Sequence, residues 1–497
     1  MRLARAFLAI AFIAAIGGCS DKNKADVEKI KQDITTELAE LAGPEKGRFF
    51  THDGVEVVPD GEGFDVKVAG VRLIPDEQQS LALGTVEFHL VAKGEDQYDI
   101  SELKLPSSLT FKEPSGGEAK LEYGEQQFKG LWSKSLNTFL SMDATYKAIK
   151  LVDSTGSEAM IDEMTASRVS TDKGGGLWDQ TTKGVAKNLR IKDVQGTMTM
   201  ANVDMANETH GMKLVELQML QQKFSQLMFT SAAGQQPDPA LLQELRAYQN
   251  WFADSNGRMD MSGMSFTDTA GATTFALDHF IVEAAATGMD QPKGNVRFGF
   301  LTLGLKIPAS DSDPTMAGFR QFIPSKFNMG FALDDVPPGE IWGAMVDMFG
   351  SMDFSQQNPE QANAAAQAFG FQLLQMLQSA GSTFRMTGWE IETPASQFKL
   401  EGSVKPNGNS PFGAIANIST EISGLDAVID GVVATLGEAG AAEIMAVVPI
   451  LHQYSNRETA ADGRIIDRYA IDLAETGEVT VNGKPLDIMG AMMGMPQ

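Results

Sequence analysis

The chain has few of the residues on which most catalytic and metal-binding sites depend. Its 497 residues include one cysteine, which excludes an internal disulfide framework, a thiolate zinc site and a CxxC redox pair. No GxSxG, GxxxxGKS/T or strand-linked GxGxxG motif is present. The histidines show no HExxH or HxH spacing, so a transition-metal site would have to be assembled by the fold. They are His52, His89, His210, His279 and His452.

The sequence is also poor in basic residues. It has 40 Lys and Arg against 65 Asp and Glu, so the formal charge is 40 − 65 = −25. Nucleic-acid binding draws most of its free energy from clustered cations that release counterions, so we expect no nucleic-acid partner. At 43% hydrophobic residues the chain is not disordered by composition, and its length is typical of roughly two to four globular units.

Long apolar runs are absent, and the N-terminal run is short. Arg2 and Arg5 precede an uncharged apolar stretch over residues 6–16. A helix of that length covers roughly half of a ~30 Å hydrocarbon core, which is typical of the h-region of a signal peptide and not of a membrane span. We therefore expect the protein to be exported.

The residues that follow this stretch resemble a bacterial lipobox. Ile16, Gly17 and Gly18 precede Cys19, and the resemblance implies cleavage before the cysteine and acylation of its thiol. Residues 1–18 are then a lipoprotein signal peptide. Each buried methylene of the acyl chains adds about 0.8 kcal/mol to membrane attachment. The alternative is a buried cysteine in an ordinary hydrophobic helix.

The residue after the cysteine bears on location. In bacterial lipoproteins a non-acidic residue there usually accompanies transport to the outer membrane, and this chain has Ser20. Aspartate favours the inner membrane, and Asp21 follows one place later. We expect the protein on the periplasmic side of the outer membrane, with the inner membrane as the alternative, and the membrane as its partner through the N-terminal lipid.

Short runs of alternating apolar and polar residues dominate the chain from residue 55 onward. Phe64, Val66 and Val68 form one such run, which is typical of a half-buried strand. Helical segments interrupt these runs. We predict an α+β fold, a long meandering antiparallel β-sheet with helical hairpins packed on one face. Other alternating runs begin at Val86, Met142, Leu189, Phe275, Val296, Phe327, Phe384, Phe398, Ala416 and Tyr469.

The same patterns divide the chain into regions. Residues 19–45 carry the lipid anchor and an amphipathic helix, because apolar residues recur every three or four positions between Val27 and Leu41. Residues 46–260 are predicted to form a β-rich N-terminal region with an αα-hairpin. Residues 261–497 are predicted to form a β-rich C-terminal region with a helical pair.

The predicted αα-hairpin covers residues 214–252. Thr209 is a candidate cap near the start of its first helix, and Asp238 followed by Pro239 is an N-cap and first helical residue for the second. Further helices are predicted over residues 341–349, 358–381 and 425–448, the last interrupted at Gly431 and Gly437.

Three local features concern strands and turns. Apolar parity slips between Phe300 and Leu301, which indicates either a β-bulge or a strand covered on both faces. Asn482-Gly483 predicts a hairpin, because both residues adopt positive φ readily. The three glycines at 174–176 lack the lysine and helix of a phosphate-binding loop and are predicted to form a flexible turn.

Soft patterns of alternation and turns recur in the last half of the chain, at residues 389–391, 398–402, 418–429 and 477–486. These segments resemble the uncharacterised YdgA-type periplasmic proteins and, more distantly, the AsmA-like group. The resemblance implies a long β-rich envelope protein and, on the AsmA-like side, an apolar groove for lipid. It brings no catalytic motif, and this chain has a lipobox where those proteins usually keep an uncleaved anchor.

Methionine clusters and one acidic loop are weak candidates for metal sites. Thioethers suit Cu(I), but methionine more often fills adaptable apolar surfaces. Asp311 and Asp313 offer carboxylates for calcium, but Phe322 stands where an EF-hand loop needs a glutamate. We expect no metal and no cofactor. The methionine clusters are Met259, Met261 and Met264, and Met489, Met492, Met493 and Met495.

Two functions from different classes remain open. We expect a lipid-anchored envelope protein that acts as a structural or protein-interaction module and is not an enzyme. The alternative is the binding or transfer of a lipid or another amphiphile in an apolar groove lined by phenylalanine and methionine. A hydrolase would need carboxylate pairs that no motif indicates. A packed interior favours the first function, and open apolar rows favour the second.

The lipobox gives a direct prediction. Cys19→Ser removes the thiol that would carry the acyl chains, so we expect this variant to lose membrane attachment. Partitioning of the protein into a detergent phase measures the effect. Unchanged partitioning of the variant would remove the premise.

Overall fold

The computed structural model describes residues 24–42, 50–76, 79–94, 96–112, 117–232, 238–308, 320–351, 359–461 and 463–486. The predicted α+β class with a meandering antiparallel sheet is confirmed, with 22% of the structure helical and 56% in strands. Within these segments, no helix is both long and apolar enough to cross a bilayer. The chain divides into a first unit, residues 1–233 with 268–270, and a second unit, residues 234–267 with 271–497.

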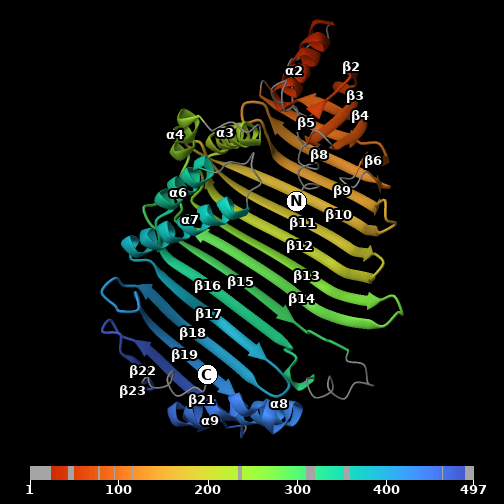
Figure 1. Cartoon of the computed structure of the whole chain (residues 1–497). Coiled ribbons are helices and arrows are strands. Elements are labelled where there is room, and N and C mark those ends of the chain that lie inside the picture. The colour runs from red at the N-terminus through yellow and green to blue at the C-terminus, as the bar shows by residue number, and fades with distance from the viewer. Residues whose placement is uncertain are drawn as a thin grey trace. The chain divides into compact units, whose positions relative to one another are not determined.

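Twelve consecutive strands, β1 to β12, build the antiparallel sheet of the first unit (Figure 1). They are β1 (Phe50–Thr51), β2 (Gly54–Asp60), β3 (Gly63–Asp76), β4 (Gln79–Ala92), β5 (Gln97–Lys104), β6 (Ser108–Lys112), β7 (Glu118–Glu122), β8 (Gln126–Ser133), β9 (Thr138–Val152), β10 (Glu158–Gly174), β11 (Leu177–Lys192) and β12 (Gly196–Met212).

The order of these strands follows the chain with one local exchange. Both β1 and β2 pair with β3, which pairs with β4. Beside β4 lie β5 and β6, which pair onward with β8 and β7. Both β7 and β8 pair with β9, and β10, β11 and β12 follow as a meander. The predicted turn at residues 174–176 joins β10 to β11, and its three glycines all have positive φ.

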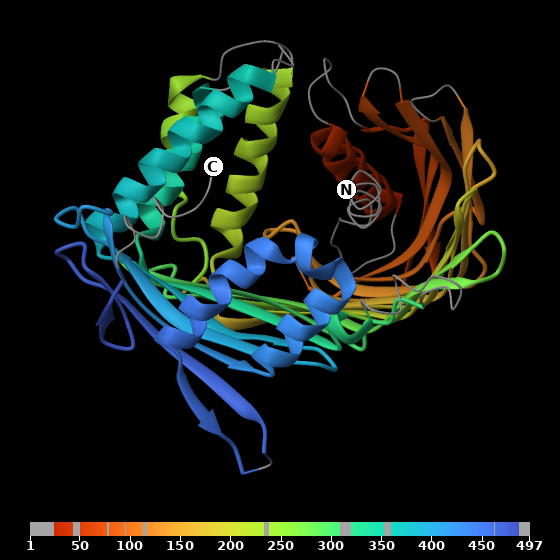
Figure 2. The same cartoon turned by 60° about the horizontal axis from the view of Figure 1, so that its bottom comes forward.

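The N-terminal helix α2 (Lys24–Ala42) lies inside the curl of the first strands (Figure 2). Ile30, Ile34 and Leu38, spaced four residues apart on one stripe, are each at most 1% exposed. They belong to one hydrophobic core with side chains such as Leu90 and Trp132 of the sheet. Full burial of such a side chain contributes about 1.5–3 kcal/mol, so the stripe holds this helix in the first unit.

The second unit has its own antiparallel meander. Its strands pair in the order β13, β14, β15, β16, β17, β18, β19 and β21, and the far side of β21 is shared by β20 and β22. The strands are β13 (Asp254–Asp268), β14 (Thr273–Thr287), β15 (Gly294–Leu303), β16 (Lys326–Val336), β17 (Thr383–Glu392), β18 (Gln397–Pro406), β19 (Ala414–Ser423), β20 (Asn456–Thr459), β21 (Ile465–Leu473), β22 (Val479–Val481) and β23 (Lys484–Pro485).

Helices stand on one face of the second unit's sheet (Figure 2). The side chain of Asp238 accepts a hydrogen bond from the amide of Ala240, so the predicted cap of α4 is confirmed. α4 packs on α6, α6 packs on α7, and α8 packs on α9. These helices are α4 (Pro239–Ala247), α6 (Pro338–Ser351), α7 (Pro359–Ala380), α8 (Leu425–Gly440) and α9 (Ala442–Tyr454). The 3-10 turn η1 (Arg320–Phe322) lies between β15 and β16.

Two predictions about helix boundaries are wrong. Thr209 does not cap a helix, because β12 continues to Met212 and α3 (Leu214–Ala232) begins only after it. Gly431 does not interrupt α8. It lies close to Gln321 and Phe322, where a Cβ would meet their side chains, and the break comes at Gly437, whose φ of 73° and ψ of 165° are non-helical.

Two strand predictions are settled by register. Phe300 pairs with Met329 and Leu301 with Asn328 without a shift, so no bulge lies there and Leu301 points to the other face. Asn482 and Gly483 have φ of 50° and 74° between β22 and β23, so the predicted hairpin is confirmed.

The core around α2 gives a stability prediction. Ile34→Ala should lower the free energy of unfolding of the first unit by about 2–5 kcal/mol, because it leaves a cavity against the sheet. Native-state hydrogen exchange of amides in β4 and β9 measures that free energy. Thr36→Ala, at an exposed position of the same helix, should change it by no more than about 0.5 kcal/mol. Equal, small effects would mean that α2 is not part of this core.

Candidate functional site

The sheet of the second unit has one apolar face, which we call the second apolar face. Antiparallel register aligns side chains across many strands, so the alternating runs of separate strands add into continuous rows. Two rows extend from β13 to β21: Met261, Phe280, Thr302, Phe327, Ile391, Phe398, Ile422 and Asp467; and Gly257, Ala284, Phe298, Phe331, Met386, Gly402, Ile418 and Ile471.

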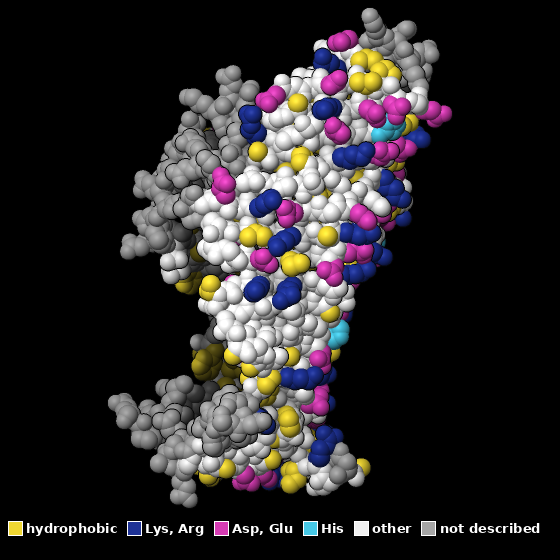
Figure 3. All heavy atoms as spheres, turned by 90° about the vertical axis from the view of Figure 1, so that its right-hand side faces the viewer, with side chains coloured by type: hydrophobic (Ala, Val, Ile, Leu, Met, Phe, Trp, Pro, Cys, Tyr) yellow, Lys and Arg dark blue, Asp and Glu magenta, His cyan; other side chains and the backbone are white. Residues whose placement is uncertain are grey.

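The opposite face of the same strands is charged. Cross-strand ion pairs there join neighbouring strands, and Figure 3 shows side chains of both signs interspersed over the surface that it displays. This face is therefore suited to water. The pairs include Arg258 with Glu283, Lys326 with Glu390, Arg385 with Asp334, and Arg468 with Glu421.

The helices α8 and α9 lie over the second apolar face. Asp467 is in the same row as Ile422, its cross-strand partner. Its carboxylate accepts hydrogen bonds from Ser455 and Arg457, which directly follow α9. The end of this helix pair is thus fixed to the apolar side of β21.

The helices cover this face incompletely. Phe298 is 45% exposed and Phe384 is 36% exposed, although both belong to the apolar side of the sheet. In the first unit, Val66 and Leu90 on the strands around α2 are at most 1% exposed. Large aromatic side chains are normally shielded from water in a fully packed core. The exposed part of this face is therefore available to another apolar molecule.

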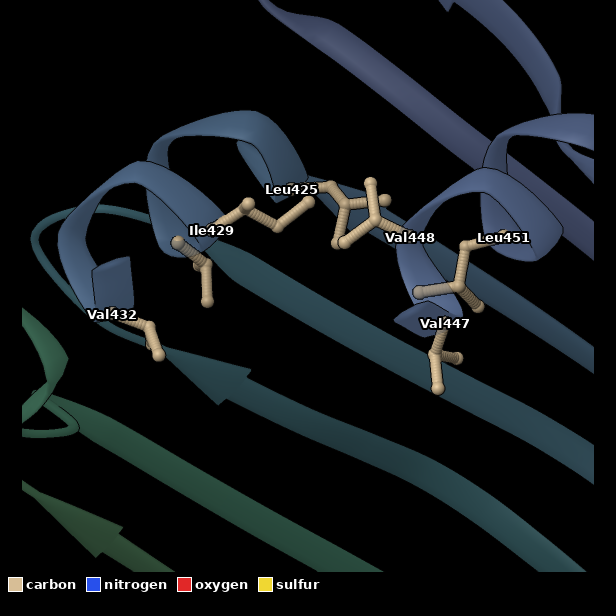
Figure 4. Close-up of a pocket in the computed structure, with 7 residues that line it drawn as sticks. Leu425, Ile429, Val432, Val447, Val448 and Leu451 are labelled. Carbon is tan, nitrogen blue, oxygen red and sulfur yellow. The ribbon is translucent and has the colours of Figure 1, made fainter. Parts of the chain in front are cut away.

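An apolar groove of about 370 Å³ lies between α8 and α9. Side chains from the two helices line it and point toward one another (Figure 4). The volume is at the lower end of the range for small-molecule sites, about 300–1,000 Å³. Only hydrocarbon side chains line the groove, which suits an acyl chain or another apolar group. They are Leu425, Val428, Ile429, Val432, Val447, Val448 and Leu451.

A charged network adjoins the groove, because Asp426 and His452 follow the lining residues Leu425 and Leu451. Arg457 donates from Nε to Oδ1 of Asp467 at 2.9 Å and from Nη2 to Oδ2 at 3.1 Å. The same Nη2 lies 3.2 Å from Oδ1 of Asp426, which His452 Nε2 also approaches at 3.2 Å. Asp467 is completely buried. Burial raises its pKa, but the hydrogen bonds from Arg457 and Ser455 outweigh that effect and hold the pKa below its ordinary value of 3.8.

The meander β9–β12 of the first unit has the same two-faced construction. One row aligns Tyr146, Met164, Ala186 and Val203 from the four strands. On the other face, Glu163 binds Lys187 across the β10–β11 pair. We call the side that carries Met164 the first apolar face.

The histidines lie beside carboxylates on separate strands and helices. His89 Nδ1 is 2.8 Å from Asp65 and 4.0 Å from Asp60, and donor atoms of the three residues lie within 4.8 Å of one another. Among the described residues, the fold thus brings together one group of three possible metal ligands. Both carboxylates are more than half exposed, and such groups are common without a metal, so we base no function on them. Other pairs are His210 with Asp179, and His279 with Asp260.

Several predicted positions lie outside the described residues. These are Cys19, the acidic loop at Asp311 and Asp313, and the methionine cluster at residues 489–495. Met259 and Met261 are described, and their cross-strand partners Val282 and Phe280 place them on the second apolar face.

The chain matches no family model, no curated protein and no solved structure. The candidate site is therefore defined by its own geometry alone.

Asp467 and the groove were not identified from the sequence. Asp467 lies two residues before Tyr469, so alternation places both side chains on the inward side of the strand. A charged residue at an inward position indicates a buried ion pair. Its partner Arg457 lies on another strand, so the pairing needs the fold.

The network gives a prediction about stability and pH. Arg457→Met leaves the buried Asp467 carboxylate without its guanidinium, so the free energy of unfolding at pH 7 should fall by about 3–5 kcal/mol. A carboxyl with a lowered folded pKa stabilises the fold above its unfolded pKa and loses that effect as the pH falls through the folded pKa. In Arg457→Met this pKa rises, so acid destabilisation should begin at a higher pH.

Urea unfolding across a pH series measures both effects. Arg468→Met removes a partly exposed arginine that pairs with Glu421 and Glu458, and should cost about 1 kcal/mol or less. The double variant Arg457→Met, Asp467→Leu should recover much of the loss. Equal costs for the two single variants would contradict a special role of the ion pair with the buried Asp467 carboxylate.

Proposed function

We propose that this protein is a non-enzymatic envelope lipoprotein that binds an amphiphile on the apolar side of its sheet. The partly exposed rows of the second apolar face carry the proposal. Rows rich in phenylalanine, methionine and isoleucine give an acyl chain apolar contacts across several strands. The α8–α9 groove adds a concave, hydrocarbon-lined site for the chain or its end.

Packing separates this function from a purely structural one. The strands around α2 have a filled core, and that part of the chain suits a structural role. The second unit leaves aromatic side chains open, as Phe298 shows. Such exposure costs free energy in a protein with no ligand or partner, which supports a binding function for this face.

The proposed attachment follows from the N-terminal sequence. A lipid on Cys19 would hold the chain at a membrane, on the periplasmic side of the outer membrane or, alternatively, of the inner membrane. The membrane is then also the source of the amphiphile. The resemblance to YdgA-type and AsmA-like proteins agrees with a β-rich envelope protein and remains part of the proposal.

Photocrosslinking in cells tests the function on the full chain. p-Benzoylphenylalanine is placed at Phe298, on the second apolar face, or at Val447, in the groove. The matched control is the same residue at Lys399, which is exposed on the opposite face of β18. Mass spectrometry of the peptide containing the probe then identifies what it has bonded.

We expect lipid-mass adducts at positions 298 and 447, and a yield at least about tenfold lower at position 399. Adducts to other proteins at positions 298 and 447 would indicate that a protein partner, and not an amphiphile, binds this face. Adducts only within the chain itself would favour the structural module.

A further inference from the structure

Arg168 is a charged residue on the first apolar face. It lies on β10, two and four residues after Ala166 and Met164, and alternation puts all three side chains on the same side. Its cross-strand partners are Met142 on β9 and Thr182 on β11. Thr182 pairs in turn with Asn207 on β12, so the guanidinium lies in a mixed row where the first apolar face becomes polar.

Arg168 has no carboxylate partner among the residues that the structure describes. Its bonds are to the amide oxygen of Gln180, which accepts from Nε at 2.8 Å and from Nη2 at 2.5 Å in the amide orientation that satisfies both groups. The remaining N–H groups of the guanidinium have no described acceptor. By contrast, Arg258, Arg385, Arg457 and Arg468 each pair with a carboxylate.

The neutral partner leaves the charge of this partly buried guanidinium uncompensated. Burial lowers the pKa of Arg168, although the group stays protonated. A partly buried charge without a counterion loses part of its hydration, and an anion bound there recovers part of that cost. A planar guanidinium binds a carboxylate or a phosphate with paired hydrogen bonds.

The surroundings of Arg168 change from polar to apolar along the strands. On one side, Ser170 and Gln180 are cross-strand partners and Thr209 extends their row, so hydroxyl and amide groups gather there. On the other side, the next rows are apolar. They contain Ala144, Ala166, Gly184 and Met205, and then Tyr146, Met164, Ala186 and Val203.

The apolar rows beside Arg168 are open at their β12 end, although Ala144 and Tyr146 at the β9 end are buried. Met205 is 51% exposed. Gly184 has no side chain, and a Cβ there would come within 3.3 Å of the end of Met205. A chain lying along these rows therefore meets hydrocarbon side chains directly next to the guanidinium.

We propose that Arg168 binds the head of an anionic amphiphile, a carboxylate or a phosphate, while the acyl chain lies on the rows of Met205 and Val203. This inference rests on the proposed function and names the ligand class for the first unit. Charge complementarity selects the occupant, because a neutral lipid would leave the guanidinium unpaired.

The test uses the same in-cell photocrosslinking on the full chain. p-Benzoylphenylalanine replaces Met205 in chains that carry Arg168, Arg168→Gln, Arg168→Lys or Arg190→Gln. Arg190 is an exposed arginine on the opposite face of β11, so its variant makes the same change in charge away from the site. A probe at position 298 in each background reports the second unit independently.

Adducts at position 205 should carry a carboxylate or a phosphate, and their masses distinguish a fatty acid from a phospholipid. Arg168→Gln should lower their yield at least about tenfold, which is the effect of losing one charge-assisted hydrogen bond. Arg168→Lys should keep a measurable part of the yield, and Arg190→Gln all of it.

Two results would overturn the inference. One is a set of neutral adducts at position 205 in the chain with Arg168. The other is an unchanged yield in Arg168→Gln. Anionic adducts at position 205 without lipid adducts at position 298 would instead retain the Arg168 site and reject lipid binding by the second unit. A loss of adducts at both positions in Arg168→Gln alone would assign Arg168 a structural role and overturn its role in binding.

Discussion

The structure depends on the alternation of apolar and polar side chains along each strand, in a register that keeps the apolar side chains of successive antiparallel strands on one face. Each strand alone presents only a few apolar side chains, but aligned register adds them into rows that cross the sheet. Such a face must be removed from water. The two units meet this constraint differently, because α2 fills the curl of the first strands, whereas the helices of the second unit leave part of the apolar side exposed.

The two charged residues on the apolar faces, Asp467 and Arg168, differ in how their charges are compensated. Asp467 is fully buried, but Arg457 and Ser455 satisfy it from the chain itself, so that end of the second unit is complete without a ligand. Among the described residues, Arg168 donates only to the neutral amide of Gln180. The contrast between these two groups separates a structural ion pair from a site that a charged ligand would complete.

Much of the fold could be predicted from local sequence patterns. Period-two runs located strands such as β3 and β16, and Asp238-Pro239 and Asn482-Gly483 located a helix start and a hairpin. Local patterns failed where tertiary packing decides, as at Thr209 inside β12. Site residues were harder still. The partners of Asp467 and Arg168 come from other segments, so neither the satisfied pair nor the unsatisfied guanidinium can be recognised before register is known.

The far side of β21 has a consequence for self-association. A long strand with unpaired backbone groups would recruit a strand from another copy, but here β20 has four residues and β22 has three, and they divide that side between them. All four side chains of β20 are exposed, and Arg457 and Glu458 among them are charged. Short, charged border strands do not template further pairing. This border of the sheet therefore resists fibre growth.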